Sequence, residues 1–415
     1  MDEAERVVKY SKVVRRTVIS LKIYIQYYLL ELIMEREIII LGDIEMGGGT
    51  LTDDFIADQS LAQLIKSQAR KKHPVELILN GDTFDFLKCP YIDEENRRSY
   101  PRHITRSISL KKLQDIHRAH QQVFAALKYF LSKKENQITF VIGNHDHDLF
   151  FKEVQTELGR LISAQKNISF GLNYQKYGLY AEHGQQYDFL NKINKHKPWV
   201  SYRGEKILNV PWIALGIISN FLTLKEEHPF LERIFPRPLL FSHHQVVVKK
   251  LSWRSVQYVL KSLFYYPFRY INDPTYFMPR VILRELYRRF KKVHWDVDSI
   301  VSVFKKKRKR LMKKNYLHVL GHVHQHYLEE SKGDWILLHS DTWRDEYTLD
   351  KQSKMVVPKI KKYVDIVINN NQISSWELKK WPLKQKSYPF SALIKNELGY
   401  LKKAAEAEQY QFITR

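Results

Sequence analysis

The sequence predicts an α/β fold built from layers of strands and helices, and three observations support this prediction. Short apolar runs rich in Ile, Val and Leu recur along the chain, as expected of buried strands bounded by turns. Segments with helical periodicity lie between these runs, for example 54–71 and 109–133. Several strand runs end in clusters of polar residues. Strands that alternate with helices are typical of layered α/β domains, whose sites lie at the edge where the strands end.

The predicted strands fall into two groups along the chain. They are residues 37–41, 75–79, 137–142 and 178–181, followed after a long gap by 316–320, 335–339, 362–369 and 372–378. Between the groups, the chain after Asp188 is aromatic, basic and interrupted by prolines, which predicts a large, mostly helical insertion. We therefore expect five segments: an amphipathic helical segment at 1–35, a first core part at 36–190, the insertion at 191–314, a second core part at 315–380 and a helical tail at 381–415.

The positive charge of the chain is concentrated in the insertion. The 415 residues include 68 Lys and Arg against 45 Asp and Glu, which gives a formal net charge of +23. A hydrophobic content of 44% supplies a core and excludes a wholly disordered chain. Residues 249–314 alone hold 19 Lys and Arg but only 4 Asp and Glu. Such a basic block indicates contact with nucleic acid, an anionic membrane surface or a polyanionic substrate, and does not distinguish among them.

The ends of the chain and its apolar runs predict a cytoplasmic protein. The N-terminus is acidic, so no secretory signal is expected, and the single cysteine, Cys89, cannot form an intramolecular disulfide. Residues 17–34 are apolar but carry charges, which favours an amphipathic helix over a membrane span. Residues 207–224 are predicted to form a buried or interfacial helix. We also expect peripheral contact with the inner face of the membrane.

Five polar clusters that follow predicted strands carry the chemistry. They are residues 42–45, 81–85, 143–146, 182–184 and 321–324. Together they supply carboxylates, imidazoles and one amide oxygen, which is the ligand set that two neighbouring divalent metals require. Glycines within the clusters permit tight turns and a close approach of the backbone to the metals. The sequence therefore predicts a dinuclear metal site at one edge of the sheet.

The order of these clusters resembles the calcineurin-like metallophosphoesterase superfamily. Its pattern is D-x-H, G-D-x-x-D, G-N-H-[DE], a lone His and G-H-x-H, and four of the five blocks match fully here. The resemblance covers residues 36–190 and 315–345. It implies a layered α/β/β/α sandwich, into which this chain inserts its large basic segment. It also implies hydrolysis of a phosphoester or pyrophosphate bond by a water that two metals activate.

The resemblance implies two metal positions that share one bridging carboxylate. The first would be held by Asp43, Glu45, Asp82 and His324. The second would be held by Asp82, Asn144, His183 and His322. His145 would lie beside the substrate phosphate, as an acid for the leaving group or as an electrostatic stabiliser, and Asp85 would orient it. The residues alone leave a second role open for Asp85, which is to cap a helix after its strand.

Glu45 departs from the family pattern, which usually has histidine at this position. Carboxylates bind Mn²⁺, Mg²⁺ and iron, so the substitution is compatible with a working site. We expect two divalent ions. Because the substitution replaces a neutral donor by an anion, we expect a preference for Mn²⁺ or Mg²⁺, while Fe and Zn²⁺ remain options. The alternative is that Glu45 turns away and leaves one metal weakly held. A chain altered in this way would be a metal-poor scaffold without catalysis.

The substrate must be inferred from the insertion. Residues 180–188, followed by a helical insert, look most like UDP-2,3-diacylglucosamine pyrophosphatases, in which a helical lid holds acyl chains at the membrane face. The insertion combines aromatic residues at 263–268 with basic clusters at 288–292 and 305–310, which favours an anionic bilayer as the partner of residues 207–314. Two alternatives remain. The basic face could simply be solvated over an aromatic core, or a nuclease or nucleotide phosphodiesterase could grip a phosphate backbone with a basic lid.

Overall fold

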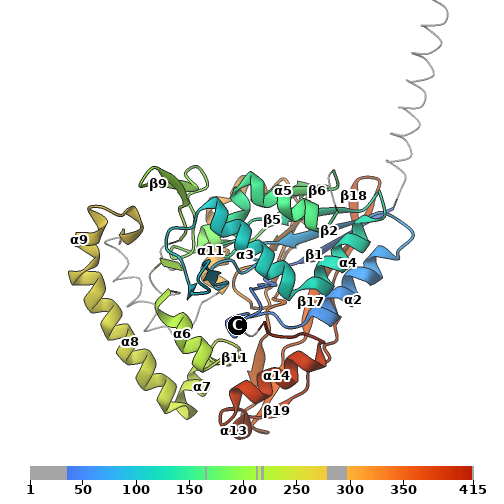
Figure 1. Cartoon of the computed structure of the whole chain (residues 1–415). Helices are drawn as coiled ribbons and strands as arrows, with labels where there is room; N and C mark the ends of the chain where they lie inside the picture. Colours follow the sequence, from blue (N-terminus) through green and yellow to red (C-terminus); the bar gives the residue numbers. More distant parts are fainter. Residues whose placement is uncertain (1–34, 164–165, 212–213, 216–218, 278–296, 414–415) are drawn as a thin grey trace, which may run out of the picture.

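A computed structural model describes residues 35–163, 166–211, 214–215, 219–277 and 297–413. The amphipathic helix predicted for residues 1–35 lies outside the described residues except for Glu35. The described chain contains two large sheets with helices around them, and a smaller sheet near the C-terminus (Figure 1). The first described strand, β1, spans Arg36–Leu41, close to the strand predicted at 37–41.

The larger sheet has six strands. Their spatial order is β18 (Gln372–Trp381), β17 (Lys361–Asn369), β1, β2 (Val75–Asn80), β5 (Gln137–Val141) and β6 (Ile168–Gly171). The last four of these are parallel, whereas β17 and β18 are antiparallel. Parallel strands deliver their carboxyl ends to one edge. The predicted clusters at 42–45, 81–85 and 143–146 therefore leave the sheet at the same edge.

The second sheet has five strands. Their order is β13 (Leu328–Ser331), β14 (Trp335–His339), β12 (Leu317–Leu320), β8 (Leu179–Glu182) and β7 (Tyr174–Lys176). Strand β12 lies parallel to both β8 and β14. The clusters at 182–184 and 321–324 thus begin at neighbouring carboxyl ends, even though the long insertion separates them in the sequence.

The alternation of side chains along the strands builds the four layers. Ile38, Ile40 and Ile78 face the second sheet and form one core with residues such as Val319. Ile39 and its neighbours on the opposite face pack against the first helical layer. That layer consists of α2 (Asp58–Ala69), α3 (Arg106–Ala119), α4 (Gln121–Leu131) and α5 (Lys152–Leu161). The outer face of the second sheet packs against α11 (Val297–Lys307) through Ile300, Val301 and Phe304. The predicted α/β/β/α sandwich is therefore confirmed.

The residues after the first core part form a peripheral array. It comprises β9 (Trp199–Tyr202), β10 (Glu205–Leu208), α6 (Ser219–Glu227), α7 (Arg237–His243), α8 (Gln245–Phe264), α9 (Tyr266–Tyr270) and α12 (Lys309–Met312). In Figure 1 the long helix α8 runs along the outside of the molecule, away from the two large sheets. The run at 207–224, predicted to be one helix, begins in strand β10 and reaches α6 only at residue 219, so that prediction was wrong at its start.

The sequence did not indicate a third sheet, which draws on three distant segments. Its strands are β11 (Ile234–Phe235), β15 (Tyr347–Leu349), β16 (Met355–Pro358) and β19 (Tyr388–Pro389). They share a core with α13 (Phe390–Leu393) and α14 (Glu397–Ala407). A two-stranded ribbon of β3 (Tyr91–Ile92) and β4 (Arg98–Ser99) completes the strands. No helix within the described ranges is both long and apolar enough to cross a membrane.

The helix predicted over residues 109–133 is divided at His120 into α3 and α4. The imidazole of His120 is fully buried. Its Nδ1 lies 3.0 Å from Asp58 Oδ2, and its Nε2 lies 3.0 Å from Asp53 Oδ2 and 3.1 Å from the carbonyl oxygen of Gly47. Both ring nitrogens face only acceptors, so both donate, and the ring is an imidazolium. Local periodicity could not reveal this contact because its partners precede His120 by more than 60 residues.

We expect the stability of the protein to fall in mildly alkaline solution because of His120. Burial alone would lower the pKa of His120, but the charges of Asp58 and Asp53 outweigh it and raise the pKa to about 10. The contribution to stability is complete below the unfolded pKa of about 6.5 and is lost as the pH rises through about 10. The free energy of unfolding, measured by urea titration, should decrease by a few kcal/mol between those values. His120→Gln should flatten this profile, and an equally steep decrease in that variant would contradict the assignment.

Candidate metal centre

The strand-end loops hold the predicted ligands in an unusual backbone conformation. Five of the seven predicted metal ligands have positive φ: Asp43 (50°), Glu45 (58°), Asp82 (50°), His322 (78°) and His324 (56°). Residues with a Cβ rarely adopt this region, and such conformations persist only where the surrounding structure imposes them. Other non-glycine residues of the described chain also have positive φ, but five of them gather in these strand-end loops.

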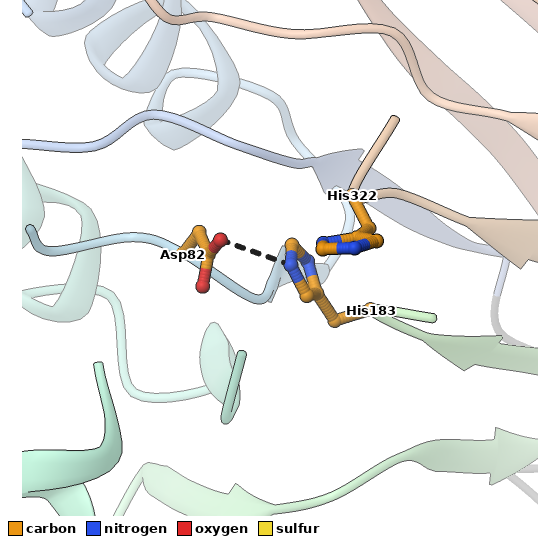
Figure 2. A group of neighbouring side chains, drawn as sticks. All are labelled: Asp82, His183 and His322. Atoms are coloured by element: carbon orange, nitrogen blue, oxygen red, sulfur yellow. Dashed lines mark ion pairs between the residues drawn. The ribbon is translucent and has the colours of Figure 1, made fainter. Parts of the chain in front are cut away.

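One group of donors converges from three loops, as Figure 2 shows for Asp82, His183 and His322. One potential ligand atom from each of these residues lies within 4.8 Å of those of the others. His183 Nε2 is 3.0 Å from Asp82 Oδ2 and 3.1 Å from Asn144 Oδ1. His183 Nδ1 is 3.2 Å from the carbonyl oxygen of Asn80, a contact that orients the ring and leaves Nε2 directed at the centre. Asp188 Oδ2 lies 3.1 Å from His322 Nε2.

A second group adjoins the first. Asp43 Oδ1 is 3.2 Å from His324 Nε2 and 3.9 Å from His183 Nε2, so this carboxylate lies between the two groups. Glu45 Oε1 is 3.5 Å from His324 Nε2. The other nitrogen of His324, Nδ1, is 2.8 Å from Glu346 Oε1. One potential ligand atom each of Glu45, Asp82 and His145 also lies within 4.8 Å of those of the others, so Asp82 is near both sets of donors.

The residues present fit a pair of divalent cations. Asp43, Glu45 and Asp82 are carboxylates at most 2% exposed, and buried anions need cationic partners. The glycines make room for these side chains. A Cβ at Gly81 would overlap the ring of His183, and one at Gly143 would overlap Asp82. A Cβ at Gly321 would lie 2.7 Å from Asp43 Oδ2. Carboxylate, imidazole and amide donors packed without intervening side chains are the surroundings that Mn²⁺, Mg²⁺, iron and zinc accept.

His145 and Asp85 form a pair beside the donors. His145 Nδ1 lies 2.9 Å from Asp85 Oδ1, and the backbone N–H of His145 donates to Asp82 Oδ1 at 2.8 Å. Burial alone would lower the pKa of His145, but the charges of Asp85, Glu45 and Asp82 raise it to about 9. Bound cations would oppose this rise. Asp85 Oδ1 also accepts the backbone N–H of Lys88 at 2.9 Å. Asp85 therefore closes this turn and also contacts His145.

Sequence reasoning missed the cations that surround Glu45. Lys88 Nζ lies 2.9 Å from Glu45 Oε2, 2.6 Å from Asp54 Oδ2 and 3.2 Å from Asp85 Oδ2. Arg344 Nε lies 3.7 Å from Glu45 Oε2, and both cations are buried. Burial alone would raise the pKa of Glu45, but the charges of Arg344 and Lys88 outweigh it and lower the pKa to about 2. One oxygen of Glu45 therefore faces these cations while the other faces His324, and its role as a metal ligand remains a prediction.

The missed residues adjoin the motifs in the sequence. Lys88 follows the 81–85 cluster by three positions, and Asp188 ends the run that begins at 182. Arg344 and Glu346 follow the segment 339–343, where the match to the family pattern is poor. The positions of these residues next to the motifs could have marked them as candidates for the site. However, charged residues are mostly exposed in proteins, so residue type gave no reason to expect these side chains in a buried network.

Comparison with known proteins identifies one family by its sequence model. The family described as calcineurin-like phosphoesterase matches residues 37–339. This range contains every predicted metal ligand together with His145 and Asp85. No curated protein matches the chain.

Proposed function

Because the chain belongs to the calcineurin-like phosphoesterase family, whose members hydrolyse phosphoesters with the help of metals, we propose that it cleaves a phosphodiester or pyrophosphate attached to a lipid or to an acylated nucleotide sugar. The reaction would take place at an anionic membrane surface. The resemblance of residues 180–188 to UDP-2,3-diacylglucosamine pyrophosphatases supports this substrate class.

The proposed mechanism assigns each side chain one task. One cation would be held by Asp43, Glu45, Asp82 and His324. The other would be held by Asp82, Asn144, His183 and His322. When bound, such cations supply an activated water and neutralise charge on the phosphoryl oxygens. His145 donates a proton to the leaving oxygen through Nε2, because Asp85 accepts the hydrogen bond from Nδ1 and so fixes the ring. Asn80 and Asp188 keep His183 and His322 in place.

The substrate proposal rests on a cavity whose wall includes residues close to His183 in the sequence, although none of the predicted metal ligands lines it. Its volume is about 810 Å³, and Glu182 and Gln185, on either side of His183, belong to its wall. Much of the remaining wall is apolar: Leu172, Tyr187, Phe189, Leu190, Ile193, Val200, Leu208, Val210, Pro211, Leu215, Pro274 and Phe277. Such a lining suits hydrocarbon better than a sugar-phosphate chain. Lys192, Lys195, Lys307 and Arg308 also line it and suit the anionic part of the substrate.

The outer helices support the membrane part of the proposal. Four large apolar side chains of this region are exposed. They are Trp253 (63%) and Phe264 (69%) of α8, Phe268 (72%) of α9, and Ile271 (77%), which follows α9. Lys249, Lys261 and Arg269 are exposed on the same helices. Aromatic residues next to lysine and arginine favour the interface of an anionic bilayer. Exposed aromatic side chains also argue against a solvated basic face that merely covers an aromatic core.

Hydrolysis of matched substrates tests the proposal. With Mn²⁺, the protein should hydrolyse UDP-2,3-diacylglucosamine with a kcat/KM about 10²-fold above that for the same nucleotide sugar without acyl chains, since burying even four methylenes contributes about 3 kcal/mol. Ile193→Asp, in the cavity wall, should remove this preference. Leu398→Asp, at an exposed position of α14, is the matched control. Equal turnover of both nucleotide sugars would contradict the acyl pocket, and faster hydrolysis of an oligonucleotide would favour the nuclease alternative.

The same assay has a membrane arm. Turnover of the acylated substrate should rise when it is presented in vesicles that contain anionic lipid. Phe264→Asp combined with Phe268→Asp should abolish the rise while turnover of a water-soluble phosphodiester stays unchanged. A vesicle effect that survives the double substitution would show that this helical face is not the contact.

A further inference from the structure

A second group of metal-ligating side chains lies away from the centre described above. His228 follows α6, His244 lies between α7 and α8, and Glu397 is the first residue of α14. Glu397 Oε1 is 3.0 Å from His228 Nδ1 and 3.2 Å from His244 Nε2. The two imidazole rings are 5.0 Å apart between centroids and nearly perpendicular, at 83°. Three donor atoms from three separate segments therefore point at one place.

The surroundings of the three donors are apolar. The donors border a small cavity of about 10 Å³ together with apolar side chains of the third sheet and its helices, and the surface that this cavity exposes is apolar. Glu397 Oε2 accepts the backbone N–H of Phe230 at 3.0 Å, which fixes the carboxylate while leaving Oε1 directed at the histidines. Held carboxylates and imidazoles in an apolar shell are typical of metal sites.

The nearby cation does not block such a site. Lys250 Nζ lies 3.4 Å from His228 Nε2, the nitrogen that points away from Glu397. The side chain of Lys250 is 43% exposed and pairs with Glu227 at 2.5 Å, so it can turn toward that carboxylate. His228 would then carry its proton on Nε2 and present the lone pair of Nδ1 to the ion.

We propose that His228, His244 and Glu397 bind a Zn²⁺ ion that fastens α6 and α8 to the C-terminal helix α14, independently of the catalytic centre. Two imidazoles and one carboxylate form a common zinc donor set, with a water molecule in the fourth position. The ion joins positions 228 and 397, which lie 169 residues apart in the chain. Because the unfolded chain has no preformed site, binding stabilises the folded state.

Zinc content and thermal stability provide the first test. The wild type should contain about one zinc equivalent more than the double variant His244→Asn with Glu397→Gln. Its melting temperature should fall on chelation and recover with Zn²⁺, whereas that of the double variant should not respond. His117→Asn, a histidine on α3 outside both clusters, is the matched control. Equal zinc content in the wild type and the double variant would overturn the proposal and leave Glu397 as the acceptor of two imidazole N–H groups.

A spectroscopic variant covers the case in which the double variant does not fold. His244→Cys keeps a zinc ligand but cannot reproduce the imidazole hydrogen bond. Loaded with Co²⁺, it should show a thiolate-to-cobalt charge-transfer band that the wild type lacks, since the native Cys89 is buried away from these residues. Absence of that band in folded protein would also overturn the proposal. Neither readout depends on phosphoester hydrolysis, so failure of the proposed function leaves this test intact.

Discussion

Replacement of Asp82 by alanine is expected to remove both bound metals and phosphoester hydrolysis together. Asp82 Oδ2 lies 3.0 Å from His183 Nε2, and Asp82 also belongs to the group formed with Glu45 and His145. A carboxylate shared by both sets of donors would hold each ion in relation to the other. Metal content by elemental analysis and hydrolysis of bis-p-nitrophenyl phosphate should therefore fall in parallel, the latter to the limit of detection.

The matched control for this prediction is Glu76→Gln. Glu76 is a buried carboxylate on β2, the strand that leads into the Asp82 loop. It accepts a hydrogen bond from the hydroxyl of Tyr174 at 2.8 Å, which glutamine also accepts. This variant should keep both metals and full activity. If the Asp82→Ala protein, folded by circular dichroism, retained two metals, Asp82 would not be the bridge.

Replacement of His145 by alanine should have a different signature, namely metals retained and turnover lost. The imidazole contacts Asp85, while the link to Asp82 is made by the backbone N–H, which alanine preserves. Loss of a positioned general acid typically costs a factor of about 10² to 10⁴. The loss should be largest for alkyl esters, because their leaving oxygen needs a proton, and much smaller for p-nitrophenyl esters, because p-nitrophenolate leaves unprotonated.

This comparison of leaving groups separates the two roles considered for His145. An electrostatic stabiliser of the phosphoryl group would lower the turnover of both ester types alike, whereas an acid would not. His326→Ala, at an exposed position beyond the 321–324 loop, is the control and should behave as the wild type. Loss of metal from the His145→Ala protein would instead show that this residue is a ligand.

Much of the centre was predictable because its residues occupy locally readable positions. A buried strand has a short apolar signature, and the residue that follows it must lie at the sheet edge. Asp43, Asp82, Asn144, His183 and His322 were therefore expected together, and the structure brings them together. The glycines among them carried a further local signal, since Gly81 has φ = 84° and leaves no room for a Cβ against His183.

The sequence by itself determined a layered α/β fold and the clusters at the strand ends, because these follow from local periodicity and spacing. The family and its α/β/β/α sandwich followed from the resemblance of these clusters to a known motif pattern. Only the tertiary structure decided which side chains surround the clusters at the strand ends. It set Lys88 and Arg344 against Glu45, broke a predicted helix at His120, and joined His228 and His244 to Glu397. Each of these contacts joins side chains far apart in the chain. A charged residue has the same identity in solvent as in a buried network, so only the folded chain reveals its partner.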